Sequence, residues 1–331
     1  MKEKKLNPIE EAKFIESEFR EYLKDTFSFK DNEYKTEFER ELDKQVLYKG
    51  PFLNISLPFV SSKSINDLIE EGTVSPLFKK LNNIDFNQKL YYHQEQALRK
   101  LTNGRNVVIT TGTGSGKTES FLYPILNSIL RDIEKGDNGP GIRAILLYPM
   151  NALVNDQMDR LRNILMNYTE IRFGFFTGET EEEEYKNTRE ELFKKFGTKI
   201  PQNEVISREE IRNNPPHLLF TNYSMLEYLL IRPNDFKIFN KEYLRHWKFI
   251  VLDEAHTYSG ALGIEVSYLL KRLTGLIEKK PQFILTSATL GEKGKDEQTI
   301  IEFAKSLTSS NYSESDIIFS TRKNLDDSNI E

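Results

Sequence analysis

Residues 106–118, NVVITTGTGSGKT, constrain the fold of this chain more than any other segment. The segment begins with an uninterrupted β-branched run that favours a buried strand, and Lys117 and Thr118 open an amphipathic helix. Three glycines lie in the loop between them: Gly112, Gly114 and Gly116. Such a loop is typical of phosphate binding, because glycine lets backbone N–H groups approach phosphate oxygens.

The helix after this loop points its positive end, roughly half a charge, at the same place. In such loops the lysine reaches the β- and γ-phosphates and the next hydroxyl holds Mg²⁺. One position departs from the usual pattern, because Thr111 stands where the first glycine is expected. The predicted cofactor-binding residues of the loop are Thr111, Gly112, Thr113, Gly114, Ser115, Gly116, Lys117 and Thr118.

Composition indicates an ordinary soluble globular protein. The 331 residues are 38% hydrophobic and 29% charged, and no run approaches the roughly 18 apolar residues of a membrane span. The net charge of −5 argues neither for nor against nucleic acid, because a local basic stripe is sufficient. Cysteine is absent, which excludes disulfides, zinc ribbons and thiol catalysis within the chain. We expect a cytoplasmic protein with no membrane segment, since the start of the chain also lacks an apolar signal-peptide core.

Apolar strand-like runs alternate with helical patterns through most of the chain. This alternation predicts an α/β fold with a parallel sheet covered by helices on both faces, and ligands at the carboxyl ends of the strands. The expected strands are 106–111, 143–148, 171–176, 217–221, 248–253 and 282–287. The expected helices are 93–102, 117–134, 151–166, 224–230, 260–277 and 297–308.

Changes in composition predict where the chain divides. A charged insertion, 179–216, interrupts the alternation, and Ser207 with Glu210 indicates one capped helix inside it. The predicted divisions are 1–75 as a mainly helical and extended N-terminal accessory region, 76–315 as the main domain, and 316–331 as a C-terminal linker or tail.

A second site of chemistry follows the apolar strand KFIVLD. This strand ends at Asp253, and Glu254, Ala255 and His256 come next. Hydrolysis of a nucleoside triphosphate needs a carboxylate that holds the metal and a base that orients the attacking water. We expect Asp253 to take Mg²⁺ and Glu254 to polarise the water.

Three motifs, in this order, resemble motifs I, II and III of superfamily 2 helicases, and the DEAH form of the second resembles the DExH-type members. They are Gly112–Thr118, Asp253–His256 and Ser287–Thr289. Tyr92-His93-Gln94 resembles the adenine-reading Q motif. The run DEAHTYSGALGIEVSYLLKRL is similar to the Lhr and MrfA (YprA-like) group of DNA helicases. The resemblance covers about 85–310 and implies a RecA-like P-loop ATPase domain that uses ATP and Mg²⁺.

The resemblance also implies roles for single residues. Gln94 is expected to hydrogen-bond adenine, whose edge suits a carboxamide. His256 is expected to communicate between the nucleotide and motif III, with Ser287 and Thr289 as coupling groups. The implied catalytic residues are Lys117, Asp253, Glu254 and His256, with Thr118 and Asp253 at the metal. Nucleic acid is expected to be held mainly by its phosphate backbone, through Asn151, Thr177, Gly178, Thr221 and Asn222.

These features favour the first motor domain of a DNA helicase or translocase, with single-stranded or partly duplex DNA as partner and a setting in DNA repair or defence against foreign DNA. The resembled group implies 3′→5′ movement. No segment resembles the QxxGRxGR type of motif that carries an arginine finger, so a second RecA-like domain or subunit is an expected partner, without which hydrolysis is slow. The alternatives are an RNA-remodelling motor and an ATP-gated docking module without motor activity.

Overall fold

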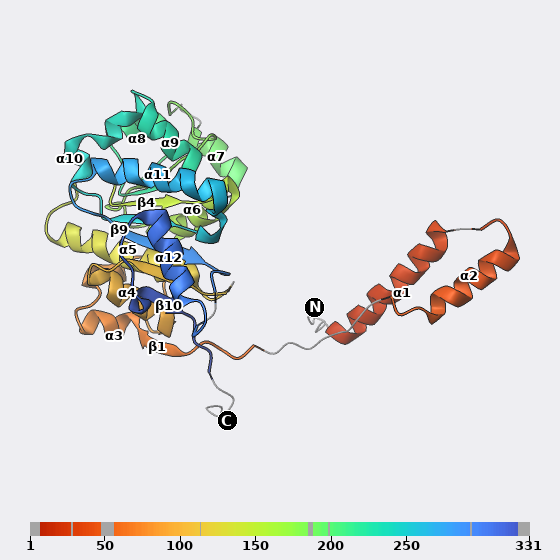
Figure 1. Ribbon diagram of the computed structural model, residues 1–331. Helices are drawn as coiled ribbons and strands as arrows, with labels where there is room; N and C mark the ends of the chain where they lie inside the picture. Colours follow the sequence, from red (N-terminus) through yellow and green to blue (C-terminus); the bar gives the residue numbers. More distant parts are fainter. Residues whose placement is uncertain are drawn as a thin grey trace. The chain divides into compact units, whose positions relative to one another are not determined.

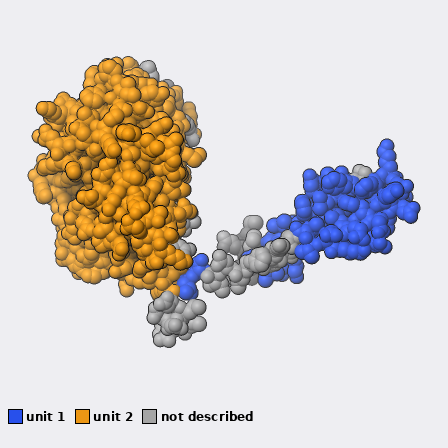
Figure 2. Space-filling view, in the orientation of Figure 1, with its two compact units in different colours: residues 1–57 blue, residues 58–331 orange. Residues whose placement is uncertain are grey.

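The computed structural model describes residues 7–27, 29–47, 56–112, 114–184, 188–197, 199–291 and 293–323. It divides the chain into two compact units, residues 1–57 and 58–331 (Figure 2). Thr113, one of the predicted cofactor-binding residues, lies outside the described residues. Each unit is described separately below.

The described part of the first unit contains two helices, α1 (Pro8–Thr26) and α2 (Asn32–Lys44). Each begins after a polar side chain that accepts hydrogen bonds from its first N–H groups. Arg20 joins the two helices, because its guanidinium donates to the carbonyl oxygens of Leu42 and Gln45 at 2.5 and 2.7 Å. The predicted helical character of the N-terminal region is confirmed for these residues.

The second unit is built on an eight-stranded sheet with the order β10-β3-β9-β8-β4-β7-β5-β6. Figure 1 labels β10, β9 and β4 of this sheet among the helices that pack around it. Every neighbouring pair is parallel, as predicted. The strands are β3 (Val107–Thr110), β4 (Ala144–Leu147), β5 (Phe173–Phe176), β6 (Glu204–Val205), β7 (Leu218–Thr221), β8 (Phe249–Leu252), β9 (Gln282–Ser287) and β10 (Ile317–Phe319). A separate antiparallel pair is formed by β1 (Ser61–Ser64) and β2 (Lys89–Tyr91).

Helices follow the strands in the pattern that the sequence indicates. They are α3 (Ile65–Glu70), α4 (Tyr92–Thr102), α5 (Lys117–Glu134), α6 (Asn151–Leu165), α7 (Thr188–Phe196), α8 (Arg208–Asn213), α9 (Tyr223–Ile231), α10 (Lys241–Leu244), α11 (Gly260–Leu276) and α12 (Glu297–Thr308). The six predicted strands and six predicted helices are all confirmed within one or two residues at each end. The helix predicted from Ser207 is α8, and the Ser207 side chain accepts a hydrogen bond from Glu210 N at 3.3 Å. Of the described helices, none has the length and apolar character needed to cross a membrane.

Both faces of the sheet are buried, which explains the uninterrupted apolar strands. Along β3, Val107 and Ile109 pack into one core cluster with α4, α5 and α6, whereas Val108 packs into a second cluster with α9, α11 and α12. Successive side chains of a strand point to opposite faces, so a strand covered on both sides must be apolar at every position. The fold therefore places its polar chemistry at the strand ends.

The predicted start of the main domain at residue 76 is wrong, because the second unit begins at Pro58. Ile65, Leu68 and Val74 are fully buried in the same cluster as Val107. They belong to α3 and the turn after it, where Ser64 and Asp67 form a capping box. A short, capped and half-apolar helix has the same sequence pattern whether it lies on the surface of a domain or packs into its core.

The predicted C-terminal tail also needs correction. Ile317 and Ile318 are buried, and β10 pairs with β3 as an edge strand of the sheet, with Ile317 opposite Val108. The charged insertion likewise contributes β6, which pairs with β5 at the other edge. Both edge strands have only two or three residues, too few to show a period in the sequence.

Candidate nucleotide site and nucleic-acid edge

Three neighbouring strands bring the predicted catalytic segments together. In the sheet β9 lies between β3 and β8, with Ser287 opposite Thr110 and Leu285 opposite Leu252. The glycine loop therefore follows one neighbour of β9, and the Asp253–Glu254 pair follows the other. The Thr111 N–H donates to the Ser287 carbonyl oxygen at 3.1 Å, which fixes the start of the loop against β9.

The central contact of the site is an ion pair between the glycine loop and the acid pair. Lys117 Nζ lies 2.9 Å from Glu254 Oε1, and the two side chains are 12% and 27% exposed. Glu254 adopts a left-handed backbone with φ of 46°, a conformation that is costly for a residue with a side chain. The proximity of Lys117 to the acid pair, which the motor interpretation requires, is present.

Asp253 is a half-buried carboxylate that directly follows β8. Burial raises the pKa of Asp253, while a hydrogen bond donated by Thr286 Oγ1 opposes that rise. The other carboxylate has an unsatisfied atom, because Glu254 Oε2 is buried and accepts no hydrogen bond among the described residues, with His256 Nδ1 3.3 Å away. Two half-buried carboxylates beside one lysine fit a hard divalent cation, which takes oxygen ligands.

The glycine loop leaves room for phosphate. Gly114 and Gly116 have φ of 73° and 71°, which favour glycine. A Cβ at Gly112 or Gly114 would meet no atom within 4 Å, so the inner side of the loop is open. The α5 helix starts at Lys117 with Thr118 next, and no side chain caps its first N–H groups, which are therefore available to an anion. The residues present fit a nucleoside triphosphate with Mg²⁺.

Gln94 lies against the glycine loop. Its Nε2 donates to the Gly116 carbonyl oxygen at 3.0 Å, and its Oε1 accepts from Tyr91 N at 2.9 Å. A cavity of about 370 Å³ opens beside it, lined by Tyr91, Gln94, Gly114, Gly116 and Tyr123 among others. The predicted adenine-reading residue therefore stands in the wall of a ligand-sized cavity that adjoins the loop.

His93 is a residue to which the sequence assigned no role. Its ring is fully buried, and its Nε2 lies 2.9 Å from the Ser115 carbonyl oxygen, so the ring contacts the backbone of the glycine loop. Burial lowers the pKa of His93, which keeps the ring neutral. Ser115 in turn donates to Thr111 Oγ1 at 2.9 Å. The hydroxyl of Thr111, at the position of the missing glycine, thus helps to shape the loop.

Motif II and motif III are in direct contact. His256 Nδ1 and Ser287 Oγ lie 3.0 Å apart and share a hydrogen bond. Ser287 Oγ also accepts from Thr289 N at 3.1 Å. The three residues predicted to couple the nucleotide to motif III form one connected group.

The residues predicted to hold nucleic acid follow three adjacent strands, β4, β7 and β5. Asn222, the N-cap of α9, donates through Nδ2 to Asn151 Oδ1 at 2.9 Å, and Asn151 begins α6. Gly178 is exposed, and a Cβ there would meet no atom within 4 Å. Like Gly178, Asn151 and Asn222 are at least partly exposed at this edge of the sheet.

The two threonines of this set are placed differently. Thr221 is fully buried and donates to the Phe176 carbonyl oxygen at 2.6 Å. Thr177 is also buried, and its hydroxyl accepts from Glu179 N at 3.2 Å. Their hydroxyls therefore shape the loops instead of facing a ligand. Arg208, which the sequence did not suggest because it lies in the insertion, donates to the Thr177 carbonyl oxygen at 3.0 Å and brings a cation to this edge.

Comparison with known proteins identifies the family. Residues 91–297 match the DEAD/DEAH box helicase family. The chain is 32% identical to Druantia protein DruE of Escherichia coli, over 78% of this chain and 18% of that protein. It is 30% identical to an uncharacterised ATP-dependent helicase of Methanocaldococcus jannaschii, over 73% of this chain and 29% of that one. The chain thus spans less than a third of the length of each of these relatives.

The solved structures agree with the fold and with the predicted group. The helicase MrfA bound to DNA and AMPPNP matches with a TM-score of 0.55 and 25% identity, over 86% of this chain and 33% of that one. The helicase Mss116 bound to single-stranded RNA matches with a TM-score of 0.54, but at 16% identity it is similar in fold alone. The eight-stranded unit is accordingly a RecA-like helicase domain, and the chain belongs to the DEAD/DEAH box helicases, in the group of the Lhr and MrfA proteins.

Proposed function

We propose that the second unit binds ATP with Mg²⁺ between the glycine loop and the Asp253–Glu254 pair, and that it is the first motor domain of a DNA helicase or translocase. The observation that supports this most directly is the ion pair between Lys117 and Glu254, 2.9 Å long. A lysine that reaches phosphates and a carboxylate that orients water must adjoin one another at such a site.

Each residue has a defined task in this proposal. The loop N–H groups and Lys117 hold the phosphates, and Thr118 and Asp253 hold the metal. Mg²⁺ supplies charge neutralisation at the transferred phosphoryl group. Glu254 accepts a proton from the attacking water. Since Lys117 is bound to Glu254 in this structure, phosphates must draw the lysine away, and Glu254 becomes free as a base only when a nucleotide is present.

DNA is the proposed nucleic acid. The support is that MrfA, whose structure was solved with DNA, is 25% identical to this chain over the aligned part, whereas the RNA-bound Mss116 is 16% identical. A second RecA-like domain or subunit is proposed to supply an arginine finger, worth about 10³–10⁵ in rate. The support for this part is that no segment of the chain resembles the motif that carries such an arginine.

The test uses Glu254→Gln, which keeps the shape of the side chain and removes its basicity. We expect the variant to bind a fluorescent ATP analogue with Mg²⁺ at least as well as the original protein, because Lys117 is released, and to hydrolyse ATP about a hundredfold more slowly or worse. Lys117→Ala should lose nucleotide binding. If Glu254→Gln hydrolyses ATP like the original protein and alters neither nucleotide binding nor affinity for single-stranded DNA, the ATP-gated docking module becomes the better explanation. Steady DNA-stimulated hydrolysis by this chain alone would overturn the need for a second domain.

A further inference from the structure

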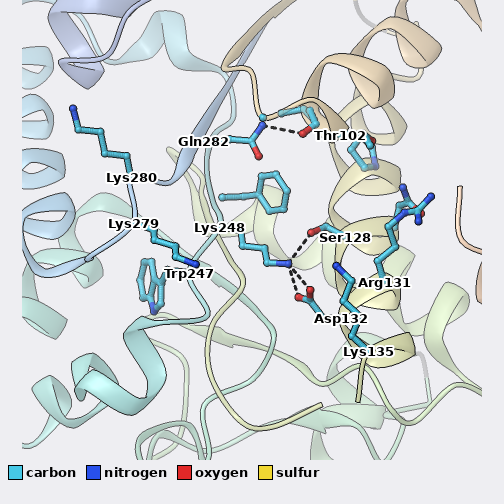
Figure 3. Close-up of a pocket in the computed structure, with 15 residues that line it drawn as sticks. Thr102, Ser128, Arg131, Asp132, Lys135, Trp247, Lys248, Lys279, Lys280 and Gln282 are labelled. Carbon is cyan, nitrogen blue, oxygen red and sulfur yellow. Dashed lines mark hydrogen bonds and ion pairs between the residues drawn. The ribbon is translucent and has the colours of Figure 1, made fainter. Parts of the chain in front are cut away.

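A second cavity, of about 330 Å³, lies at the amino ends of the strands, away from the nucleotide site. It is lined by the last turns of α5, by Trp247 and Lys248 at the start of β8, and by Lys279 and Gln282 at the start of β9 (Figure 3). The charged lining residues at the end of α5 lie 14 to 18 positions beyond Lys117, which corresponds to roughly 21 to 27 Å along the helix. This cavity is therefore separate from the glycine loop.

The cavity is strongly cationic in a chain whose net charge is −5. One carboxylate lines it, that of Asp132, and five cationic side chains do: Arg131, Lys135, Lys248, Lys279 and Lys280. Lys248 Nζ forms an ion pair with Asp132 and lies 2.6 Å from both carboxylate oxygens. Among the described residues, no carboxylate lies within ion-pair distance of the other four cations.

Two residues of the lining carry a buried donor without a hydrogen-bond partner among the described residues. Arg131 Nε is buried without a hydrogen-bond partner among the described residues, while its Nη2 donates to the carbonyl oxygens of Gly72 and Thr73. Trp247 is 2% exposed, and its Nε1 has no partner within the described part of the chain. A buried donor left unpaired costs about 1–3 kcal/mol, so each of these two atoms calls for an acceptor.

Figure 3 shows how the charges are arranged. Lys248 lies between Lys279 on one side and the α5 side chains Arg131, Asp132 and Lys135 on the other, and Lys280 directs its ammonium away from this group. Cations at the end of α5 also offset the partial negative charge of a helix C-terminus. That explanation covers Arg131 and Lys135, but Lys279 arrives from another element and is not explained by it.

We propose that this cavity binds a small ligand that carries two or more closely spaced phosphate groups. Charges that converge from two walls favour a compact anion with charge at both ends, and the volume lies in the range of small-molecule sites. An extended nucleic-acid backbone is better matched by a stripe of cations along an open surface than by a concave group. The free polyphosphate and the polyphosphate moiety of a nucleotide share this chemistry.

Trp247 makes the proposal testable without a label, because it is the one tryptophan of the chain and it lines the cavity. Inorganic tripolyphosphate is titrated into Lys117→Ala, whose glycine loop no longer competes for phosphate, and Trp247 fluorescence is followed. We expect a saturable change. Adding Lys135→Glu and Lys279→Glu should weaken binding at least tenfold. The matched control carries Lys199→Glu and Lys305→Glu, two exposed lysines outside the cavity lining, and should bind like the parent.

Further arms separate the possible sources of phosphate. Pyrophosphate, ADP and tripolyphosphate at equal ionic strength distinguish the free anion from a nucleotide, and sulfate should give no saturable change. The proposal is overturned if both charge-reversed variants bind tripolyphosphate like the parent, or if both lose binding equally. It is also overturned if duplex DNA at equal phosphate concentration binds more tightly and depends on Lys135 and Lys279, because the surface is then a nucleic-acid contact.

Discussion

His256 Nδ1 lies 3.0 Å from Ser287 Oγ, so the segment after β8 touches the segment after β9 beside the nucleotide site. If this contact couples the nucleotide to motif III, His256→Ala and Ser287→Ala should each lower DNA-stimulated ATP hydrolysis about five- to tenfold, the value of one hydrogen bond. ATP-analogue affinity should stay within about twofold. The measurement is a double-mutant cycle on the hydrolysis rate of the complete motor, and fully additive effects would contradict a shared contact.

Gly116 is expected to tolerate no side chain. Its φ is 71°, and a Cβ would lie 2.4 Å from Gln94 Nε2, so Gly116→Ala strains the loop by about 1–2 kcal/mol and displaces Gln94. We expect at least a tenfold loss of ATP-analogue affinity by fluorescence titration. Gly275→Ala is the matched control, because a Cβ there meets no atom within 4 Å and the residue lies in α11. Equal binding by both variants would show that the loop adapts.

The insertion is expected to contribute to stability through one buried ion pair. Arg162 donates through Nε and Nη2 to the two carboxylate oxygens of Glu204 at 2.8 and 2.7 Å, and the side chains are 1% and 0% exposed. Arg162→Met leaves a buried carboxylate without its partner, so urea unfolding should show a loss of about 3–5 kcal/mol. The double variant that also carries Glu204→Met should recover much of the lost unfolding free energy.

Two comparisons make that prediction specific. Removing the exposed pair between Arg40 and Glu37 should change stability by less than about 1 kcal/mol. A double variant at Arg162 and Glu204 that is no more stable than Arg162→Met would mean that the arginine acts through packing alone.

Stability is expected to fall in mild acid because of His217. This ring is buried, accepts a hydrogen bond from Arg172 N at 3.1 Å, and burial lowers its pKa to about 3. The unfolded chain takes up a proton near pH 6.5. The unfolding free energy should therefore be highest above pH 6.5 and decrease towards pH 3, by at most about 1.4 kcal/mol per pH unit from this group.

Urea titrations at pH 7.5 and 5 measure this dependence. His217→Asn keeps an acceptor for Arg172 and should flatten it. His256→Asn, at a half-buried ring near the site, should leave it unchanged. An unaltered slope in His217→Asn would assign the acid sensitivity to other groups, of which His246 and His93 also have pKa values lowered mainly by burial.

The sequence by itself determined the strands and helices of the second unit and the chemistry at their ends. β-branched runs such as Val107–Thr110 are specific because a strand buried on both faces excludes polar residues. Glycines, a lysine and an acid pair that directly follow such strands indicate their roles by their spacing along the chain. The phosphate-binding character of the loop at 112–118 and the metal-binding character of the pair at 253–254 can therefore be predicted from the sequence alone.

Only the tertiary structure decided which polar residues face outward and which are buried. Thr221 and Asn222 are neighbours in sequence, but their side chains have different partners. The Thr221 hydroxyl donates a hydrogen bond to the Phe176 carbonyl oxygen, whereas the Asn222 side chain donates to Asn151. His93 and Arg162 have partners 22 and 42 residues away, a pairing that no local pattern encodes. The short edge strands β6 and β10 depend equally on a neighbour, because two or three residues gain stability as strands only when a sheet is already there to pair with.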